Sequence, residues 1–485
     1  MLEDGQQAGV AEDDPGFAEQ VSDEQLDSGT NAHGAKSRGG GIDLLIANGE
    51  LVPLGDAGQH VWAADIAVVD SEIVGVGRRE ALEGQFGPSS EVLDARGRYV
   101  MPGIVNAHTH LFQAAFRGLG DGLDLSEWRD RVMRPIYDHL TAEDAYFFSM
   151  LGALENLRSG VTTAVTFQAS PNDVEACELV AQAVGEAGLR SWVVKALASP
   201  TANRPGDWES VFGALYELLR RPPSYDGRIR FAAGPSRPSA IPSEWLQEAH
   251  AMAQQFDSRL HTHVAEAKES TREIKALHGK SDVAYLQGLG ILDDRLQAVH
   301  CVDLDSDDLA LLANSRTTAV HCPIANMYLA DGIADVVSLR QAGVNVALGS
   351  DGPASNNNQD MFAVMKVAAL LQRTLHTNPQ ACAPLEALHM ATLNGAVACD
   401  FAGGSIAVGQ VADLVVLDLS GLNNQPMHDP VTAIVFSAQA SDVETVIVGG
   451  RVAMRKRVFA SVDDAEVIAE AEQRVRALLG RAGLA

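Results

Sequence analysis

The 485-residue chain has few cysteines and no long hydrophobic run. Its five cysteines are odd in number and have no CxxC spacing, and most of them lie in apolar segments, which predicts reduced core residues. No uninterrupted apolar stretch approaches the roughly 20 residues that span a bilayer, and the N-terminus has no basic and apolar signal pattern. We therefore expect a cytoplasmic protein that has no membrane partner.

Positive charge is also scarce. Against 64 Asp and Glu there are only 36 Lys and Arg, so the formal net charge is −28. Nucleic acid and anionic membranes would repel such a surface, and a small neutral or cationic ligand suits it better. Residues 1–41 carry nine acidic and two basic side chains with almost no apolar periodicity. This composition predicts a disordered acidic tail.

Short β-branched runs are present near both ends of the chain. Residues 42–100 contain such runs divided by breaks, of which "NGE" at 48–50 and "DSE" at 70–72 are expected to be hairpin turns. Residues 402–460 contain similar short β-branched runs, "ADLVVLDL" and "VETVIVGGRVAM". We predict one small β-sandwich domain formed from both chain ends, with two unrelated β appendages as the alternative. A C-terminal helix is expected over 461–485.

Between these segments, residues 101–401 alternate eight apolar strand-like runs with helical patterns. The runs are "GIVNAHTH", "TTAVTF", "RSWVVKALA", "IRFAAGP", "RLHTHVAE", "LQAVHCV", "TTAVHCP" and "VNVALGSDG". Two of the intervening patterns, at 142–160 and 171–188, end in glycine as helices often do. Eight such units predict a (β/α)₈ TIM barrel of the α/β class. An open doubly wound sheet is the alternative, but neither GxGxxG nor GxxxxGK[ST] follows any run.

Polar titratable residues end five of the eight predicted strands. They are His108 and His110 after the first, His263 and Glu266 after the fifth, His300 after the sixth, His321 after the seventh and Asp351 after the eighth. Residues two apart on a strand share a face, so His108 and His110 both point into the barrel mouth. A single histidine in a strand is more often a hydrogen-bonded core residue, but the whole set predicts a metal site. Imidazole and carboxylate ligands suit zinc, iron or another first-row divalent ion that activates a water.

The sequence resembles the amidohydrolase superfamily, in the branch of adenosine-type and S-adenosylhomocysteine deaminases and triazine (chloro)hydrolases. The resemblance rests on "MPGIVNAHTHL", "HTHVAE", "AVHCV", "HCPIAN" and "GSDGPASNNNQDMF", which stand in the family's order, and it covers about 42–460. It implies a (β/α)₈ barrel flanked by a β-sandwich from both chain ends, in agreement with the order of strand-like and helical segments. It allows a homo-oligomer, and no feature of the sequence decides the number of subunits.

The resemblance also implies the residues of the site. His108, His110, His263 and Asp351 would bind one divalent metal ion, with zinc as the first expectation and iron as the alternative. His263 is chosen over His261 because a glutamate follows it three residues later, in the family's HxxE arrangement. Binuclear relatives carry a bridging lysine on the fourth strand, but "IRFAAGPS" has none. Lys195 lies on the third strand and is expected to be structural.

Three residues are implied to act on the substrate. Asp351 would accept a proton from the attacking water, His300 would orient that water, and Glu266 would protonate a ring nitrogen. His321 is expected either near the metal without binding it or in the core.

Loops after the strands are expected to set specificity. Phe112, Gln113, Arg117 and Trp128 in the loop after the first strand, Gln168 after the second, Ser236 after the fourth and His321 are the candidate substrate contacts. Nucleoside deaminases of this branch carry "GPHSP" after the fourth strand, whereas this chain has "GPSRPSAIP" and places Ser236 where the histidine would be. That departure argues against a nucleoside substrate.

The predicted function is hydrolytic deamination of an amino-substituted nitrogen heterocycle, a pterin, purine or triazine, with release of ammonia. One alternative is the same attack on another leaving group, by triazine dealkylamination or dechlorination or by urea or carbamate hydrolysis. The alternative from another class is a non-catalytic metal-binding scaffold. The complete set that includes both Glu266 and His300 argues against a scaffold, because a scaffold needs neither.

Overall fold

The computed structural model describes residues 41–55, 61–197 and 207–484. The acidic tail predicted for 1–41 lies outside the described residues except for Gly41. No helix in the described part of the chain is both long and apolar enough to cross a bilayer.

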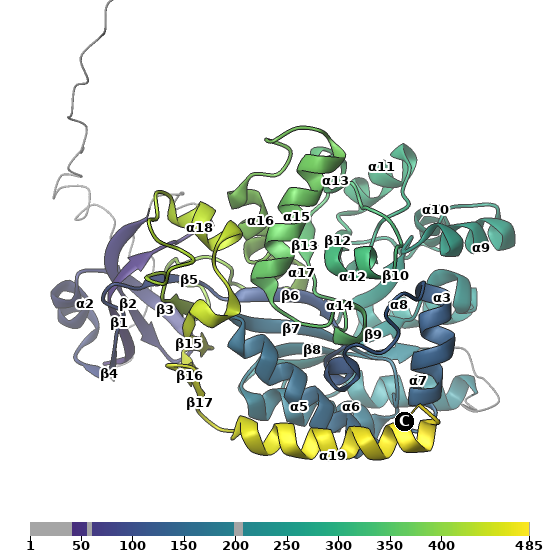
Figure 1. Cartoon of the computed structure of the whole chain (residues 1–485), viewed down its shortest axis with the longest axis horizontal. Coiled ribbons are helices and arrows are strands. Elements are labelled where there is room, and N and C mark those ends of the chain that lie inside the picture. The colour runs from purple at the N-terminus through teal and green to yellow at the C-terminus, as the bar shows by residue number, and fades with distance from the viewer. Residues whose placement is uncertain (1–40, 56–60, 198–206, 485) are drawn as a thin grey trace, which may run out of the picture.

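Eight parallel strands form a barrel at the centre of the molecule (Figure 1), and they are the eight strands expected from the sequence. They are β6 (Ile104–Thr109), β7 (Val161–Gln168), β8 (Arg190–Leu197), β9 (Ile229–Pro235), β10 (Leu260–Val264), β11 (Leu296–His300), β12 (Thr318–His321) and β13 (Val346–Leu348). Each strand pairs with the next in chain order. The last strand returns to the first, where the backbone N–H of Asp351 donates to the carbonyl oxygen of His108 at 3.0 Å. The predicted (β/α)₈ barrel is confirmed.

Helices between the strands cover the outside of the barrel (Figure 1). The longer ones are α5 (Ala142–Arg158), α6 (Val174–Ala187), α7 (Trp208–Leu219), α8 (Ser243–Gln255), α9 (Lys268–His278), α11 (Ser306–Ser315) and α15 (Met361–Leu375). Local sequence sets where they begin and end. Thr141 and Asp144 form a reciprocal capping box at the start of α5, while α6 ends at Gly188 with φ of +100°.

The barrel strands are buried on both faces, which is why they read as nearly continuous apolar runs in the sequence. All eight residues of β7 are buried. Val165 and Phe167 face the barrel interior together with Trp192 and Val194 of β8. Outward-facing residues such as Val193 pack in the large core between the strands and the helices.

A second sheet of nine strands lies beside the barrel, on the left of Figure 1. It contains β1 (Ile42–Leu51), β2 (Trp62–Val69), β3 (Glu72–Gly77), β4 (Ser89–Asp94), β5 (Tyr99–Pro102), β14 (Leu414–Leu417), β15 (Val443–Val448), β16 (Arg451–Arg455) and β17 (Val458–Phe459), with the short helix α2 (Arg79–Phe86). β5 pairs with both β1 and β14, and Leu44, Ile66, Leu414 and Ile447 share one core. Both chain ends therefore build one small β domain, as predicted.

Only one of the two predicted hairpin turns is present. The "DSE" break at 70–72 separates β2 from β3, which pair in an antiparallel hairpin. The "NGE" break does not turn the chain, because β1 continues through it with a bulge between Ile46 and Gly49. Asn48 takes φ of +63° there and donates its side-chain amide to Asp94 at 2.8 Å. The tertiary pairing of β1 with β2 and β4 thus overrides the local turn signal.

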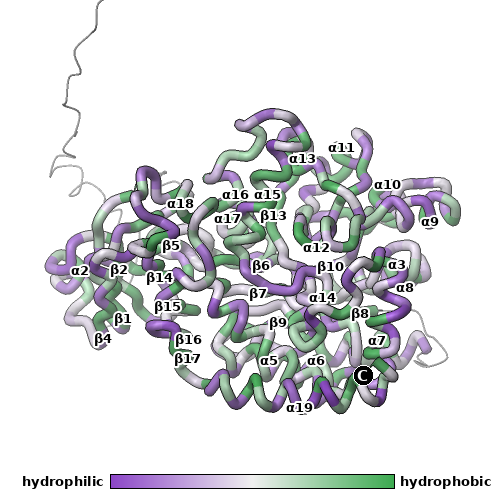
Figure 2. The backbone as a smooth tube through the Cα atoms, viewed as in Figure 1, coloured by the Kyte–Doolittle hydropathy of each residue, from purple (hydrophilic) through white to green (hydrophobic). Residues whose placement is uncertain are grey.

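The C-terminal helix α19 (Asp464–Ala482) runs along the lower edge of the molecule against α5 (Figure 1) and alternates hydrophobic with hydrophilic residues (Figure 2). Its Ala471 and Leu478 join a cluster that includes the 3₁₀ helix η2 (Leu111–Phe116) after β6. Arg481 also pairs with the buried Asp144 of α5 at 3.1 Å. The helix therefore braces the segment that follows the first barrel strand.

Candidate metal centre and active site

The polar residues predicted at the strand ends meet at one mouth of the barrel. Asp351 Oδ1 lies 3.2 Å from His108 Nε2 and 3.3 Å from His110 Nε2. Donor atoms of His108, His263 and His300 form a second group, which shares His108 with the first. His108 Nε2 is buried without a hydrogen-bond partner among the described residues. A buried imidazole nitrogen left in this way, with other donor atoms close by, fits a metal ion.

A chain of hydrogen bonds fixes the tautomer of His108. The amide nitrogen of Gln297 donates to the carbonyl oxygen of Ala398 at 2.7 Å, so its Oε1 is free to accept from Nδ1 of His261 at 2.5 Å. The other nitrogen of His261, Nε2, then accepts from His108 Nδ1 at 2.7 Å. Because Nδ1 of His108 carries the proton, its Nε2 has a free lone pair. Both ring nitrogens of His261 are thus engaged in hydrogen bonds. His261 therefore holds His108 in place and has no free lone pair for a metal ion.

Backbone carbonyl groups fix the tautomers of the other two predicted histidine ligands. Nδ1 of His110 donates to the carbonyl oxygen of Phe167 at 2.9 Å, and Nδ1 of His263 donates to that of Ser236 at 2.6 Å. Nε2 of each ring is left with a lone pair, which is the usual arrangement for histidines that bind a metal. Burial lowers the pKa of His263 to about 4, so the ring is neutral at physiological pH and can act as a ligand.

His300 has the opposite tautomer. Its Nδ1 accepts from the side-chain amide of Asn326 at 3.0 Å, and that amide also donates to Asp331 at 3.3 Å. The proton of a neutral His300 therefore lies on Nε2, which is 3.3 Å from Glu266 Oε1. An N–H group cannot bind a metal, but it can donate to a reacting oxygen. The tautomers thus separate His300 from the three rings that offer lone pairs.

Asp351 is held rigidly at the closing edge of the barrel, with φ of +57°. Its Oδ2 accepts from the hydroxyl of Ser355 at 3.0 Å, which leaves Oδ1 toward the histidines. Burial disfavours the charged carboxylate, a cost that a divalent cation held by Oδ1 and the histidines would offset. The close approach needs Gly349, because a Cβ there would lie 2.9 Å from the carbonyl oxygen of His108.

Glu266 differs from Asp351 in its environment. Its side chain is 13% exposed, and burial raises its pKa, with the charge of Asp351 acting in the same direction. Two carboxyl groups in such different environments can divide the roles of base and acid. Asp351 suits the acceptance of a proton, and Glu266 suits its donation.

A cavity of about 620 Å³ opens beside these groups. His110, His263, Glu266 and Asp351 lie at one part of its wall. Three of the predicted substrate contacts, Gln113, Trp128 and Ser236, also line it. Three arginines that sequence reasoning missed, Arg129, Arg134 and Arg237, line the wall as well. Of the three, Arg237 could have been predicted, because it lies in the "GPSRP" segment after the fourth barrel strand, directly after the predicted contact Ser236.

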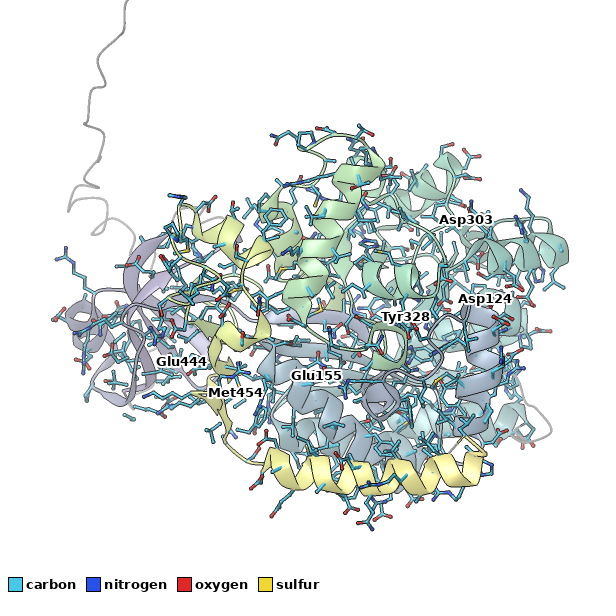
Figure 3. All side chains as sticks on the ribbon, viewed as in Figure 1. Asp124, Glu155, Asp303, Tyr328, Glu444 and Met454 are labelled. Carbon is cyan, nitrogen blue, oxygen red and sulfur yellow. The ribbon has the colours of Figure 1, made fainter. Side chains whose placement is uncertain are left out.

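The other four predicted substrate contacts do not line this cavity. Phe112 is fully buried in the cluster under α19, and Arg117 pairs with Glu155 of α5, which is labelled in Figure 3. Gln168 donates to the carbonyl oxygens of Ser170 and Pro171 at 2.8 and 3.0 Å and so holds the turn after β7. The ring nitrogens of His321 have no hydrogen-bond partner among the described residues, and burial lowers its pKa to about 3.

Lysine is absent from β9, the fourth barrel strand, every residue of which is described. Lys195 lies on β8 and is 3% exposed. Its Nζ donates to the carbonyl oxygen of Ala196 at 3.5 Å, away from the donor groups described above.

Removing the amide of Gln297 tests the support of His108. In Gln297→Leu, His261 loses the acceptor that fixes its tautomer, so we expect metal affinity to fall about 10- to 100-fold. Competition with a chromophoric chelator measures this fall, and the exposed Gln247→Leu on α8 is the matched control. Unchanged affinity in Gln297→Leu would show that the relay does not set the tautomer.

Neutral imidazoles and a carboxylate directed toward one point, beside a carboxyl group with a raised pKa, suit metal-assisted hydrolysis. Comparison with known proteins assigns the family: residues 99–453 match the Amidohydrolase family, and the chain belongs to it. The family is metal-dependent. The protein is therefore a hydrolase that acts on carbon–nitrogen bonds other than peptide bonds.

Three similar proteins are deaminases. The 5-methylthioadenosine/S-adenosylhomocysteine deaminase of Pelotomaculum thermopropionicum is 36% identical over 418 residues, which are 86% of this chain and 94% of the relative. The 5′-deoxyadenosine deaminase of Methanothermobacter thermautotrophicus is 37% identical over 442 residues, 90% and 99% of the two chains. The zinc-bound crystal structure of an adenosine deaminase from Xanthomonas campestris superposes with a TM-score of 0.83 at 31% identity, covering 90% of this chain and 99% of that one.

Proposed function

We propose that this protein hydrolyses the exocyclic amino group from the adenine ring of an adenosine-type nucleoside, using one zinc ion held by His108, His110, His263 and Asp351. The observation that carries the proposal is the tautomer pattern: the three histidines offer lone pairs, whereas His300 offers an N–H. Zinc is favoured because nitrogen and oxygen donors of this kind suit it. The zinc-bound structure of the Xanthomonas relative supports the same choice.

Each residue has a role that its geometry supports. When bound, the ion would lower the pKa of a water molecule at the site. Asp351 accepts the proton of the attacking water through Oδ1, because Ser355 already occupies Oδ2. His300 donates its Nε2–H to the oxygen that attacks the ring, and Glu266 donates a proton to the adjacent ring nitrogen. The water oxygen bonds to the ring carbon. Asp351 then passes its proton to the amino group, the carbon–nitrogen bond breaks, and the group leaves as ammonia, while Glu266 regains a proton from the oxygen added to the ring.

The substrate class rests on the relatives and on the cavity. The two similar deaminases from Pelotomaculum and Methanothermobacter act on adenosine derivatives altered at the 5′ position, as their names state. A cavity of about 620 Å³ lies in the range that holds a ligand of nucleoside size. Ser236 lines that cavity at the position of the branch's histidine, and a serine hydroxyl can bond to a ribose hydroxyl.

A heterocycle without ribose is the second candidate. Ser236 favours it, because the histidine that serves nucleosides in this branch is absent from this chain. A pterin or triazine that carries an amino group would use the same Glu266 and Asp351.

Ammonia release distinguishes the candidates. Zinc-loaded full-length protein is assayed with adenosine, 5′-deoxyadenosine, 5′-methylthioadenosine, S-adenosylhomocysteine, an aminopterin and an aminotriazine. We expect the adenine nucleosides to be turned over and the ultraviolet spectrum to shift to that of the hypoxanthine ring. Ammonia from the pterin or triazine alone would replace the nucleoside proposal with the second candidate.

We further propose a cytoplasmic location for the protein. Gel filtration of the same sample tests whether it forms a homo-oligomer.

A further inference from the structure

Three arginines gather on the wall of the active-site cavity. Arg129 and Arg134 come from the segment after β6, on the π-helical turn η3 (Arg129–Met133) and on α4 (Arg134–Tyr137), and Arg237 follows β9. The protein as a whole has a formal charge of −28. Asp138, Glu266 and Asp351 line the same cavity, so the arginines matter here as individual groups and not as a net positive charge.

Two carboxylates, of Asp130 and Glu273, form the ion pairs of these three arginines among the described residues. Asp130 serves both Arg129, at 3.3 Å, and Arg134, at 3.1 Å. Arg237 has a single ion pair among the described residues, with Glu273 at 3.7 Å, and that carboxylate also accepts from Ser239 at 3.1 Å. Nε of Arg237 is buried and has no hydrogen-bond partner among the described residues.

The position of Arg237 is tied to the metal centre. It directly follows Ser236, whose carbonyl oxygen accepts from His263 at 2.6 Å. Its side chain is only 25% exposed. Burial and the charge of Arg129 lower the pKa of the Arg237 guanidinium, while Glu273 and Glu266 act in the opposite direction. A half-buried guanidinium that lies near a like charge and has a buried, unpaired Nε is poorly satisfied without a ligand.

We propose that Arg237, with Arg129 beside it, forms a subsite for an anionic group that the substrate carries outside its reacting ring. The inference rests on the proposed nucleoside deamination and deepens it, because it separates nucleosides whose 5′ substituent contains a carboxylate or phosphate group from those whose substituent contains neither. The planar guanidinium matches both a carboxylate and a phosphate, so these two sources share one chemistry. Residues 234–238 are "GPSRP" where the branch has "GPHSP", so Arg237 takes the place of the branch's serine. The arginine is therefore a departure from the branch's motif.

Steady-state kinetics with three nucleosides test the subsite. S-adenosylhomocysteine carries a carboxylate, adenosine 5′-monophosphate carries a phosphate, and 5′-methylthioadenosine carries neither. We expect the wild type to prefer at least one anionic substrate. In Arg237→Gln, kcat/KM for that substrate should fall about 10- to 100-fold, mainly through KM, because a charged hydrogen bond is lost. For 5′-methylthioadenosine it should change less than about 3-fold.

Control variants separate the subsite from a general structural role. Arg131→Gln, on the same turn as Arg129 but exposed and outside the cavity wall, should leave all three substrates unchanged. Arg237→Lys should recover part of the lost preference because it keeps the charge. The zinc content and melting temperature of each variant are measured alongside. An equal fall for all three substrates, or no fall for any, would overturn the proposal.

Calorimetric binding distinguishes failure of the subsite from failure of the proposed reaction. Glu266→Gln protein, in which turnover is blocked, is titrated with the same three nucleosides with and without Arg237→Gln. Arg237-dependent binding of an anionic nucleoside that wild-type enzyme does not deaminate would contradict the proposed function and leave the subsite. Deamination with no dependence on Arg237, or no anionic binding by Glu266→Gln protein, would contradict the subsite alone.

Discussion

Replacing His263 by alanine is expected to empty the metal site. The ring supplies one of four donors, and its Nε2 is free to bind because Nδ1 is bonded to the carbonyl oxygen of Ser236. Loss of a ligand should weaken binding by more than the 10- to 100-fold that loss of a supporting partner costs. Metal analysis after dialysis measures the effect directly. Zinc should also raise the melting temperature of the wild type but not of His263→Ala, because only the former binds it.

The matched control is His261→Ala, two residues earlier on the same strand. His261 contacts His108 and Gln297 and not the other donors, so its loss should weaken binding only about 10- to 100-fold. Normal zinc content in His263→Ala together with complete loss in His261→Ala would reverse the two roles.

Replacing Glu266 by glutamine is expected to remove turnover while the metal stays bound. Glutamine keeps the size of the side chain but has no acidic proton to give to the ring, so kcat should fall about 10²- to 10⁴-fold. Ammonia release and zinc content are measured on the same preparation. The raised pKa of Glu266, caused first by burial, keeps more of this group protonated than in water.

Glu269→Gln provides the comparison, because Glu269 is exposed on α9 just beyond the site. It should match the wild type in both rate and metal content. Full activity in Glu266→Gln would rule out this residue as the proton donor, and loss of zinc in that variant would instead make it a ligand.

Much of the fold could be read from the sequence because it is coded locally. Barrel strands buried on both faces appear as apolar runs, and α5 and α6 begin and end at recognisable caps. The "NGE" break in β1 misled because a turn and a bulge can both use an asparagine with a positive φ, as Asn48 has here. Only pairing with distant strands decides between the two.

The substrate contacts were harder to anticipate than the metal site. Phe112 and Trp128 are aromatic residues of the same loop, yet one is fully buried in the core and the other lines the cavity. Arg117 pairs with Glu155, while Arg237, whose ion pair with Glu273 is 3.7 Å long, lines the wall. Sequence spacing does not record which side of a loop faces the core.

The sequence by itself determined the eight strands, the two-ended β domain and the residues that meet at the barrel mouth, because strand alternation and strand order place them there. The tertiary structure alone decided the proton positions. Gln297, Ser236 and Asn326 come from different strands or loops, and each sets which nitrogen of a histidine carries a proton. A tautomer depends on which partner lies within about 3 Å of each ring nitrogen. That information exists only once the chain has folded.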